Sequence, residues 1–354
     1  MTPSSEAILS TGRERYRALV GRRLLLLATL ALLLCVSLVI DISTGPARYS
    51  VLDVIRAIAT PSEVDAQRRV IIWSIRAPSA LMALAVGMAL SVAGGQMQTI
   101  LNNPLASPFT LGISAGASFG AALTLAFGIA LLPGSVDYTV PLNAFAVAML
   151  TALVIHTVNL RRGATVQTII LLGIALVFTF NALLAIVQYF VSDQAVAAMI
   201  FWTMGSLTKA TWPKLAIAVA VIVAVLPIFV RQSWALTALR MGDAKAASFG
   251  VRVHRLRLQT LLLVALLASV PVAFVGTIGF VGLVGPHIAR MMIGEDQRFF
   301  LPATALSGAL ILSLSSIVSK SLISGVIIPV GIVTSLVGMP LFFYLILRSG
   351  RQSW

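Results

Sequence analysis

The feature that most constrains this chain is a succession of long apolar segments separated by short polar ones. A helix that crosses a bilayer needs about 20 predominantly apolar residues. A water-soluble fold cannot bury this much apolar surface, because 59% of the 354 residues are hydrophobic and only 10% are charged, against about 25% charged in average soluble domains. The sequence therefore predicts an all-α polytopic membrane protein. The predicted spans are 22–40, 78–97, 109–131, 139–160, 167–190, 211–230, 258–277, 301–323 and 326–347.

A shorter apolar stretch, 279–293, is interrupted by glycines and by Pro286. Irregular backbone at membrane depth is tolerated only where it is buried in protein or lines a water-filled cavity. We therefore expect a short helix enclosed by the others. Counting it predicts ten transmembrane helices, with both termini on the same side.

The distribution of positive charge predicts which side that is. The formal net charge is +14, but the Lys and Arg residues lie in short clusters between apolar runs, which argues against a nucleic-acid surface. In the predicted topology 17 of the 25 fall on the side of the two termini, including six in 231–257, and 8 fall on the other side. Because cytoplasmic loops carry the excess of Lys and Arg, both termini are predicted to be cytoplasmic. The predicted parts are a cytoplasmic segment 1–21, a transmembrane domain 22–348 and a cytoplasmic tail 349–354.

Three connecting segments are long enough to fold locally: 41–75 and 191–210 outside, and 231–257 in the cytoplasm. The segment 191–210 predicts a short amphipathic helix outside. The cytoplasmic loop 231–257 predicts two helical stretches, 233–240 and 243–249, separated by Gly242 and ended by Gly250. A connection between helices needs only a few residues, so this loop favours a docking surface for a cytoplasmic partner.

The residues that carry enzyme or metal chemistry are not grouped in this sequence. The three histidines are far apart, and no HExxH or Walker A motif occurs. The acidic residues are all predicted to lie in loops, whereas ion-coupled carriers usually keep an ionisable residue inside the membrane. We therefore expect the energy to come from an ATPase partner. A secondary carrier or channel, or a membrane enzyme, are the alternatives.

Several long motifs then resemble the FecCD family of ABC permeases, which import ferric siderophores, haem and cobalamin. They are 75–122 (IRAPSALMALAVGMALSVAGGQMQTILNNPLASPFTLGISAGASFGAA), LLGIAL at 171–176, FWTMGSL at 201–207, ALRMGDAKAASFGV at 238–251, GTIGFVGLVGPHIAR at 276–290 and IPVGIVTSLVGMPLFFYLILR at 328–348. The resemblance implies a cobalamin-permease-like fold with ten helices per subunit, in a bacterial inner membrane. It implies iron(III)-siderophore-type chelates as cargo, with haem or cobalamin as the alternative.

The resemblance also implies partners. They are a second permease subunit (an identical or a related chain), two cytoplasmic ATP-binding subunits that use ATP and Mg²⁺, and a periplasmic substrate-binding protein. This chain itself would be no enzyme and would hold no metal or other cofactor.

Candidate site residues follow from the same resemblance. Arg76 and Lys320 would pair with carboxylates of the binding protein, and Arg68 and Arg69 would substitute for the second arginine of the family's R-x-P-R motif, which is Ser79 here. The contacts to the ATPase would be Met241, Gly242, Asp243, Ala247, Phe249 and Gly250. The cytoplasmic gate would include Asn103, Leu105, Thr165 and Gln167, with a helix cap as the equal alternative for Asn103.

Overall fold

The computed structural model describes residues 5–47, 49–62, 64–132, 134–162, 165–323 and 325–349, and over these residues the fold is helical. The strand-like pairing in the described part is one isolated bridge, between Ile323 and Val326. The helices are α1 (Ser5–Ser43), α2 (Val51–Ala59), α3 (Ala66–Val70), the π-helical turn η1 (Ile71–Arg76), α4 (Ala77–Ile100), α5 (Ile113–Phe127), α6 (Val136–Arg162), α7 (Val166–Phe190), α8 (Asp193–Thr203), α9 (Trp212–Arg231), α10 (Ser233–Leu239), α11 (Asp243–Ser248), α12 (Val253–Val275), α13 (Val281–Ile293), α14 (Gln297–Ser321) and α15 (Val330–Ser349).

Seven helices in the described part of the chain are long and apolar enough to cross a membrane. They are α1, the continuous unit α3–η1–α4, α6, α7, α9, α12 and α14. Three further apolar helices, α5, α13 and the described start of α15, are shorter. These elements coincide with the predicted spans, so the all-helical polytopic class is confirmed, while ten crossings stay a prediction.

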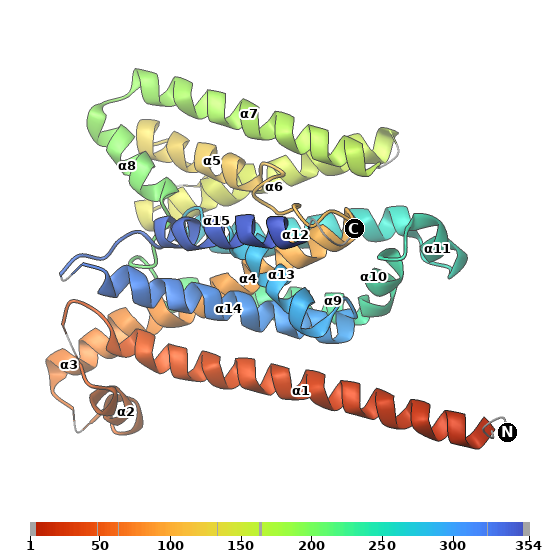
Figure 1. Ribbon diagram of the computed structural model, residues 1–354. Coiled ribbons are helices and arrows are strands. Elements are labelled where there is room, and N and C mark those ends of the chain that lie inside the picture. Colours follow the sequence, from red (N-terminus) through yellow and green to blue (C-terminus); the bar gives the residue numbers. More distant parts are fainter. Residues whose placement is uncertain are drawn as a thin grey trace.

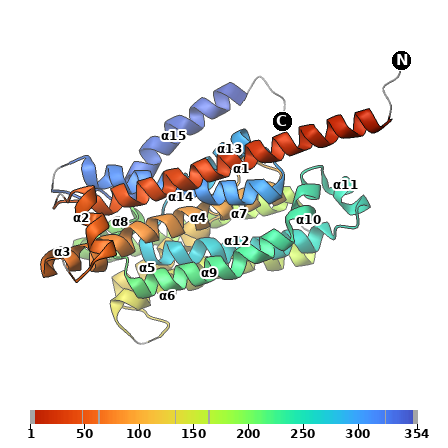
Figure 2. The same cartoon turned by 90° about the horizontal axis from the view of Figure 1, so that it is seen from below.

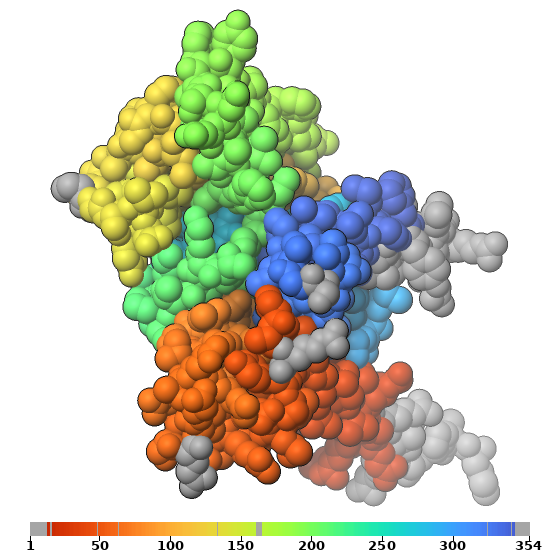
Figure 3. All heavy atoms as spheres, turned by 90° about the vertical axis from the view of Figure 1, so that its left-hand side faces the viewer, coloured from red at the N-terminus to blue at the C-terminus, as the bar shows by residue number. Residues whose placement is uncertain are grey.

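The helices run along a common direction, and the connecting helices lie at its two ends (Figure 1). The start of α1 lies at the same end as α10 and α11, whereas α2, α3 and α8 lie at the opposite end (Figures 1 and 2). Figure 3 views the molecule from this second end. We call the first end the α10–α11 end and the second the α2–α8 end. The grouping agrees with the predicted sidedness, whose orientation in the membrane stays a prediction.

The core of the bundle lies around α4, where the helices approach closely through small residues. In the most apolar window of α3–η1–α4, 83% of the residues are buried, against 17% in α7. A Cβ atom added to Gly94 of α4 would overlap the carbonyl oxygen of Gly282 in α13. One added to Gly308 of α14 would overlap Ser91. Close backbone approach of this kind is how helices gain packing contacts inside a membrane.

The predicted interruption before α13 is present as an extended connection from α12. Gly276 has φ of 78° and Phe280 has φ of 64°. The positive φ at Phe280 is unusual for a residue with a Cβ atom, and its ring packs where a side chain on Gly338 of α15 would otherwise lie. The connection is therefore held in place by α15 and by the start of α13.

Several local predictions can be compared directly with the structure. Helices form at 233–239, 243–248 and 193–203, which confirms the folded loop and the helix in 191–210. Helix α1 continues without a break across the predicted boundary at residue 22. The prediction that all acidic residues lie in loops was wrong, because α1 contains Glu6, Glu14 and Asp41, and Asp53, Asp137, Asp193 and Asp243 lie in the first turns of α2, α6, α8 and α11. Asp41 is fully buried in the last turn of α1. Residues 1–4 and 350–354 of the predicted terminal segments lie outside the described residues.

Candidate functional site

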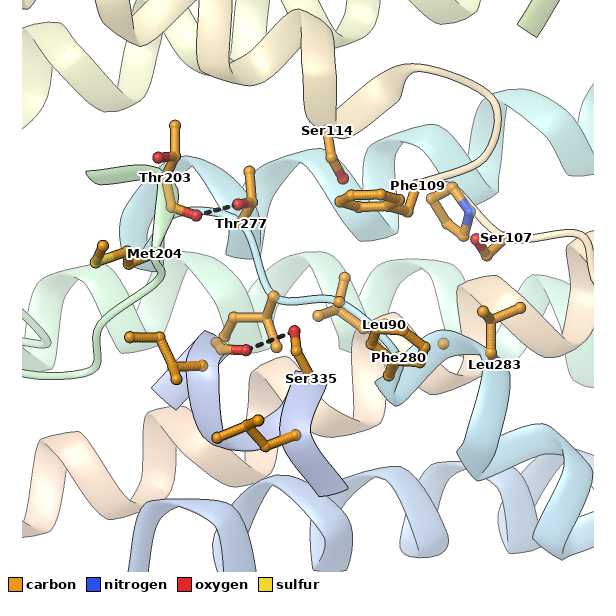
Figure 4. A pocket seen from close by; sticks show the side chains of 17 residues that line it. Leu90, Ser107, Phe109, Ser114, Thr203, Met204, Thr277, Phe280, Leu283 and Ser335 are labelled. Carbon is orange, nitrogen blue, oxygen red and sulfur yellow. Dashed lines mark hydrogen bonds between the residues drawn. The ribbon is translucent and has the colours of Figure 1, made fainter. Parts of the chain in front are cut away.

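A candidate site is a cavity of about 490 Å³ beside the interrupted segment between α12 and α13. Figure 4 shows its lining side chains, which come from the loop before α5, the end of α8, the 277–283 segment and the start of α15. The lining consists of aliphatic, aromatic and hydroxyl side chains with glycines. It is formed by Leu90, Ser107, Pro108, Phe109, Ser114, Thr203, Met204, Thr277, Ile278, Gly279, Phe280, Gly282, Leu283, Gly331, Ile332, Ser335 and Leu336.

Some hydroxyl groups of the cavity wall donate hydrogen bonds to backbone carbonyls of the wall. Thr277 Oγ1 donates to the carbonyl oxygen of Thr203, and Ser335 Oγ donates to that of Gly331 (2.8 Å). The backbone N–H of Ser206 donates to the carbonyl of Val275 (2.7 Å). The extended segment is thus fastened to the end of α8, as irregular backbone at membrane depth requires. A mostly apolar wall with fixed polar groups suits a bulky molecule better than a bare ion.

A second candidate site is the surface of α10, α11 and the turns beside them. Met241 and Phe249 are exposed by 50% and 53%, and Ala247 and Gly250 are exposed as well. Gly242 and Gly250 have φ of 98° and 82°, and a Cβ added to either would meet no atom within 4 Å. The glycines are therefore required by backbone conformation, and the space above them is open. Exposed apolar groups at the tip of the molecule fit a docking surface.

Asp243 differs from the other predicted docking residues, because its carboxylate is already paired within the chain. Arg257 Nη2 donates to both carboxylate oxygens at 3.0 and 3.1 Å. Arg257 is buried in the first turns of α12, and its Nε donates to the carbonyl of Ile100 at the end of α4 (2.9 Å). Asp243 therefore fixes α11 to α12, and a contact of Asp243 with an ATPase stays a prediction.

The predicted gate residues lie in two separate turns. Asn103 Oδ1 accepts from the backbone N–H of Leu105 (2.9 Å), which stabilises a local turn; no described helix begins between Ile100 and Ile113, so Asn103 is not the helix cap considered for it. Leu105 is 47% exposed. Thr165 is the N-cap of α7, where its hydroxyl accepts from the N–H of Thr168 (3.1 Å), and Gln167 is exposed. The structure gives Asn103 and Thr165 local structural roles, and gating stays a prediction.

The four predicted docking cations at the α2–α8 end are not equivalent. Arg76 is only 6% exposed, and its guanidinium donates to the carbonyls of Ile42, Ser43 and Ala47. Arg68 Nη1 pairs with Asp53 Oδ1 (2.8 Å). Arg69 is exposed and makes no ion pair within the described ranges. Of these three arginines, Arg69 is thus the one best placed to meet a partner directly.

Lys320 is the fourth predicted docking cation, and it belongs to a buried ion pair. Its Nζ lies 2.7 Å from Asp41 Oδ1, with side-chain exposures of 9% for Lys320 and 0% for Asp41. Ser316 also donates to Asp41 Oδ1 (2.9 Å). In the single chain Arg76 and Lys320 already have acceptors, as buried charges need. Both join the end of α1 to its neighbours, and docking through them is untested.

Two carboxyl groups outside the membrane-spanning segments have a lowered pKa. The pKa of Asp53 is lowered mainly by hydrogen bonds from the hydroxyl and backbone N–H of Ser50, which form a capping box at the start of α2. The pKa of Asp296 is lowered mainly by the Arg298 side chain, which donates to it. Both groups therefore stay ionised well below neutral pH and act as helix N-terminal anchors.

Sequence reasoning missed a polar cluster between the α10–α11 surface and the bundle. Glu295, in the turn between α13 and α14, lies 3.1 Å from Arg290 Nε and also pairs with Arg240 Nη2. Arg240 and Arg290 entered the sequence argument mainly as positive charges that set orientation. The two acids in the short segment GED between two predicted helices were the available signal, but Arg240 lies 55 positions away in sequence.

The chain is similar to known proteins over most of its length. The model of the FecCD transport family matches residues 32–348. The hemin transport system permease protein HmuU of Yersinia pestis is 36% identical, over 96% of this chain and 98% of its own length. The molybdate import system permease protein MolB of Haemophilus influenzae is 34% identical, over 91% and 95%. A solved transporter assigned to the metal-chelate type of ABC transporter, in an inward-facing conformation, is similar with a TM-score of 0.80 and 30% identity, covering 91% of this chain and 99% of that one.

Proposed function

This chain belongs to the FecCD transport family and is a multi-pass permease of an ABC importer, and from this premise we propose that it carries iron(III)-siderophore-type chelates across a bacterial inner membrane. In this family ATP hydrolysis takes place on separate subunits. Relatives are named for hemin and for molybdate, so family membership alone does not select a cargo.

The observation that carries the proposal is the character of the cavity beside the 277–283 segment. Its volume of about 490 Å³ lies within the range of small-molecule pockets, roughly 300–1,000 Å³. The lining is apolar and aromatic with a few hydroxyl groups. Such a wall can pass a bulky chelate whose metal is already enclosed by its own ligands. A bare cation would instead need oxygen, nitrogen or sulfur ligands supplied by the protein.

The proposed second permease subunit packs against the face that carries α7 and α15. Helix α7 is mostly unburied in the single chain, with Phe178 and Tyr189 exposed by 71% and 83%. Asn181, in the middle of α7, is exposed too. A polar amide facing lipid at that depth is unfavourable, so a protein partner or a water-filled path accounts for it better. Leu336 of α15, which lines the cavity, is 68% exposed.

Two further partners are proposed, one at each end of the molecule. A pair of ATP-binding subunits, which supplies the energy, binds the α10–α11 surface. A periplasmic binding protein, which delivers the cargo, binds the α2–α8 end. The exposed Met241 and Phe249 support the first contact. Arg69 supports the second, as an exposed cation in α3 at that end of the molecule.

The experiment that tests the cargo uses the complete importer, purified with its cognate ATPase and binding protein and reconstituted in liposomes. We expect ATP-dependent uptake of a radiolabelled ferric siderophore, and we expect a tenfold excess of haem, cobalamin or molybdate to leave most of that uptake in place. If one of these competitors is itself accumulated and the ferric siderophore is not, the proposed cargo is wrong while membership in the importer family still holds.

A further inference from the structure

The inference concerns the polar cluster centred on Glu295, and it rests on the proposed role of α10–α11 as the ATPase-docking segment. We propose that Glu295 is a positioning residue that fastens this segment to α13, so that movement imposed by the ATPase reaches the cavity wall. Three observations carry it: the placement of Glu295, the partners of its two arginines, and the two ends of α13.

Glu295 is placed by the turn that ends α13. Gly294 has φ of 89°, a conformation that favours glycine, and its N–H donates to the carbonyl of Arg290 (2.9 Å). This cap directs the chain back over the last turn of α13. The Glu295 carboxylate thereby comes within ion-pair distance of Arg290 (3.1 Å) and of Arg240, which follows α10 directly.

The Glu295 carboxylate therefore forms ion pairs with two arginines whose side chains are largely buried. The side chains of Arg240 and Arg290 are 17% and 13% exposed, and that of Glu295 is 41% exposed. Without the negative charge, the two guanidinium groups would repel each other in a medium of low effective dielectric constant. Glu295 thus holds Arg240 close to Arg290. Because Arg240 directly follows α10, this also holds the α10–α11 segment close to α13.

Each arginine also donates a hydrogen bond to a residue at or just after the end of α4, so three elements meet at the cluster. Arg240 Nη1 donates to Asn102 Oδ1 (2.9 Å), and Asn102 has φ of 42°. Arg290 Nη2 donates to Gln98 Oε1 (3.0 Å). The cluster therefore joins the segment after α10, the last turns of α4 and the last turn of α13.

Helix α13 connects this cluster to the cavity. It has 13 residues, so it is about 20 Å long. Gly282 and Leu283 in its first turn line the cavity, and Phe280 just before it does so as well. Arg290 lies at the opposite end, beside Glu295. A short helix held at one end by the docking segment, and forming the cavity wall at the other, can transmit a displacement between them.

The test measures cargo moved per ATP hydrolysed, with the complete importer in liposomes. Glu295→Gln keeps the size of the side chain and removes its charge. We expect binding of the ATPase subunits and ATP hydrolysis to be retained, while cargo moved per ATP falls about tenfold, the size expected from losing charge-assisted contacts. Arg240→Gln is expected to do the same. The double variant is expected to lose less than the sum of the two single losses, because both single variants remove the same pair between Arg240 and Glu295.

The matched control is Asp296→Asn, which removes a negative charge from the adjacent residue. Asp296 pairs with Arg298 and Arg23 and caps α14, and Asn retains the capping ability. The amount of cargo that this variant moves per ATP hydrolysed should equal that of the wild type. If Glu295→Gln does not assemble with its partner subunits, Arg240→Lys is measured instead. Lysine keeps the charge but cannot contact Asn102 and Glu295 together. The cargo moved per ATP by this variant should therefore fall as well.

Wild-type coupling in the Glu295→Gln variant, or in Arg240→Lys where the first is not recovered, would overturn the inference. So would an equal loss in Asp296→Asn. Failure of the wild-type importer to use ATP for uptake would instead contradict the proposed function, so the two failures are distinguishable.

Discussion

Replacing Asp41 by Asn is expected to destabilise the protein by about 3 kcal/mol or more, the range found when one partner of a buried ion pair is removed. The neutral amide would leave the Lys320 ammonium, only 9% exposed, without its carboxylate. In a thermal unfolding scan of the detergent-solubilised protein this corresponds to a decrease in Tm of roughly 5–10 °C.

Two further variants identify the cause of that decrease. Asp53→Asn removes the carboxylate of the more exposed pair with Arg68, at the same end of the molecule, and should change stability by less than about 1 kcal/mol. Combining Asp41→Asn with Lys320→Met removes the unpaired charge and should recover most of the lost stability. A Tm for Asp41→Asn equal to that of wild type would show that the buried pair does not hold α1 to α14.

Replacing Gly250 by Arg is expected to abolish ATP-driven uptake while the permease still folds. Gly250 has φ of 82°, so a side chain there costs about 1–2 kcal/mol in backbone strain. A Cβ atom would meet nothing within 4 Å, so the chain itself can accommodate it. The charged side chain would instead project from the surface that carries Phe249, where the ATPase is proposed to sit. Co-purification of the ATPase with the permease is the measurement, and we expect it to be lost.

Gly128→Arg is the matched control for that variant. Gly128 ends α5 with φ of 65°, and a Cβ added there also meets no atom within 4 Å. The backbone strain is therefore similar, but the residue lies away from α10 and α11. Normal ATPase binding by Gly250→Arg, or equal loss in both variants, would remove residues 241–250 from the docking surface.

The sequence predicted the elements of this fold well, because the physical signals are local. Apolar length identified the spans, and glycines at Gly242 and Gly250 placed the ends of the two short helices in 231–257, which the structure contains. The glycines around Gly276 and Gly279 located the interrupted segment. Irregular backbone in a membrane is either buried in protein or lines a cavity. The sequence could not distinguish these two possibilities, and the structure shows that this segment lines a cavity.

The sequence did not predict how charged residues are used, because their partners are set by tertiary packing. Lys320 and Asp41 are 279 positions apart, and Arg240 and Glu295 are 55 apart. Positive residues were interpreted through membrane orientation, which does not distinguish an exposed Arg69 from a buried Arg76. The positive φ of Phe280 likewise depends on its packing against α15 and has no signature in the residue type.

The central claim is that the chain provides a path and derives its work from ATP hydrolysis on other subunits. The most direct measurement is the ratio of internal to external labelled chelate in proteoliposomes that contain the permease alone, and in proteoliposomes that also contain the ATPase, the binding protein and ATP. We expect accumulation above the external concentration only in the second preparation. Accumulation against the concentration gradient by the permease alone, driven by a proton or sodium gradient, would contradict the claim.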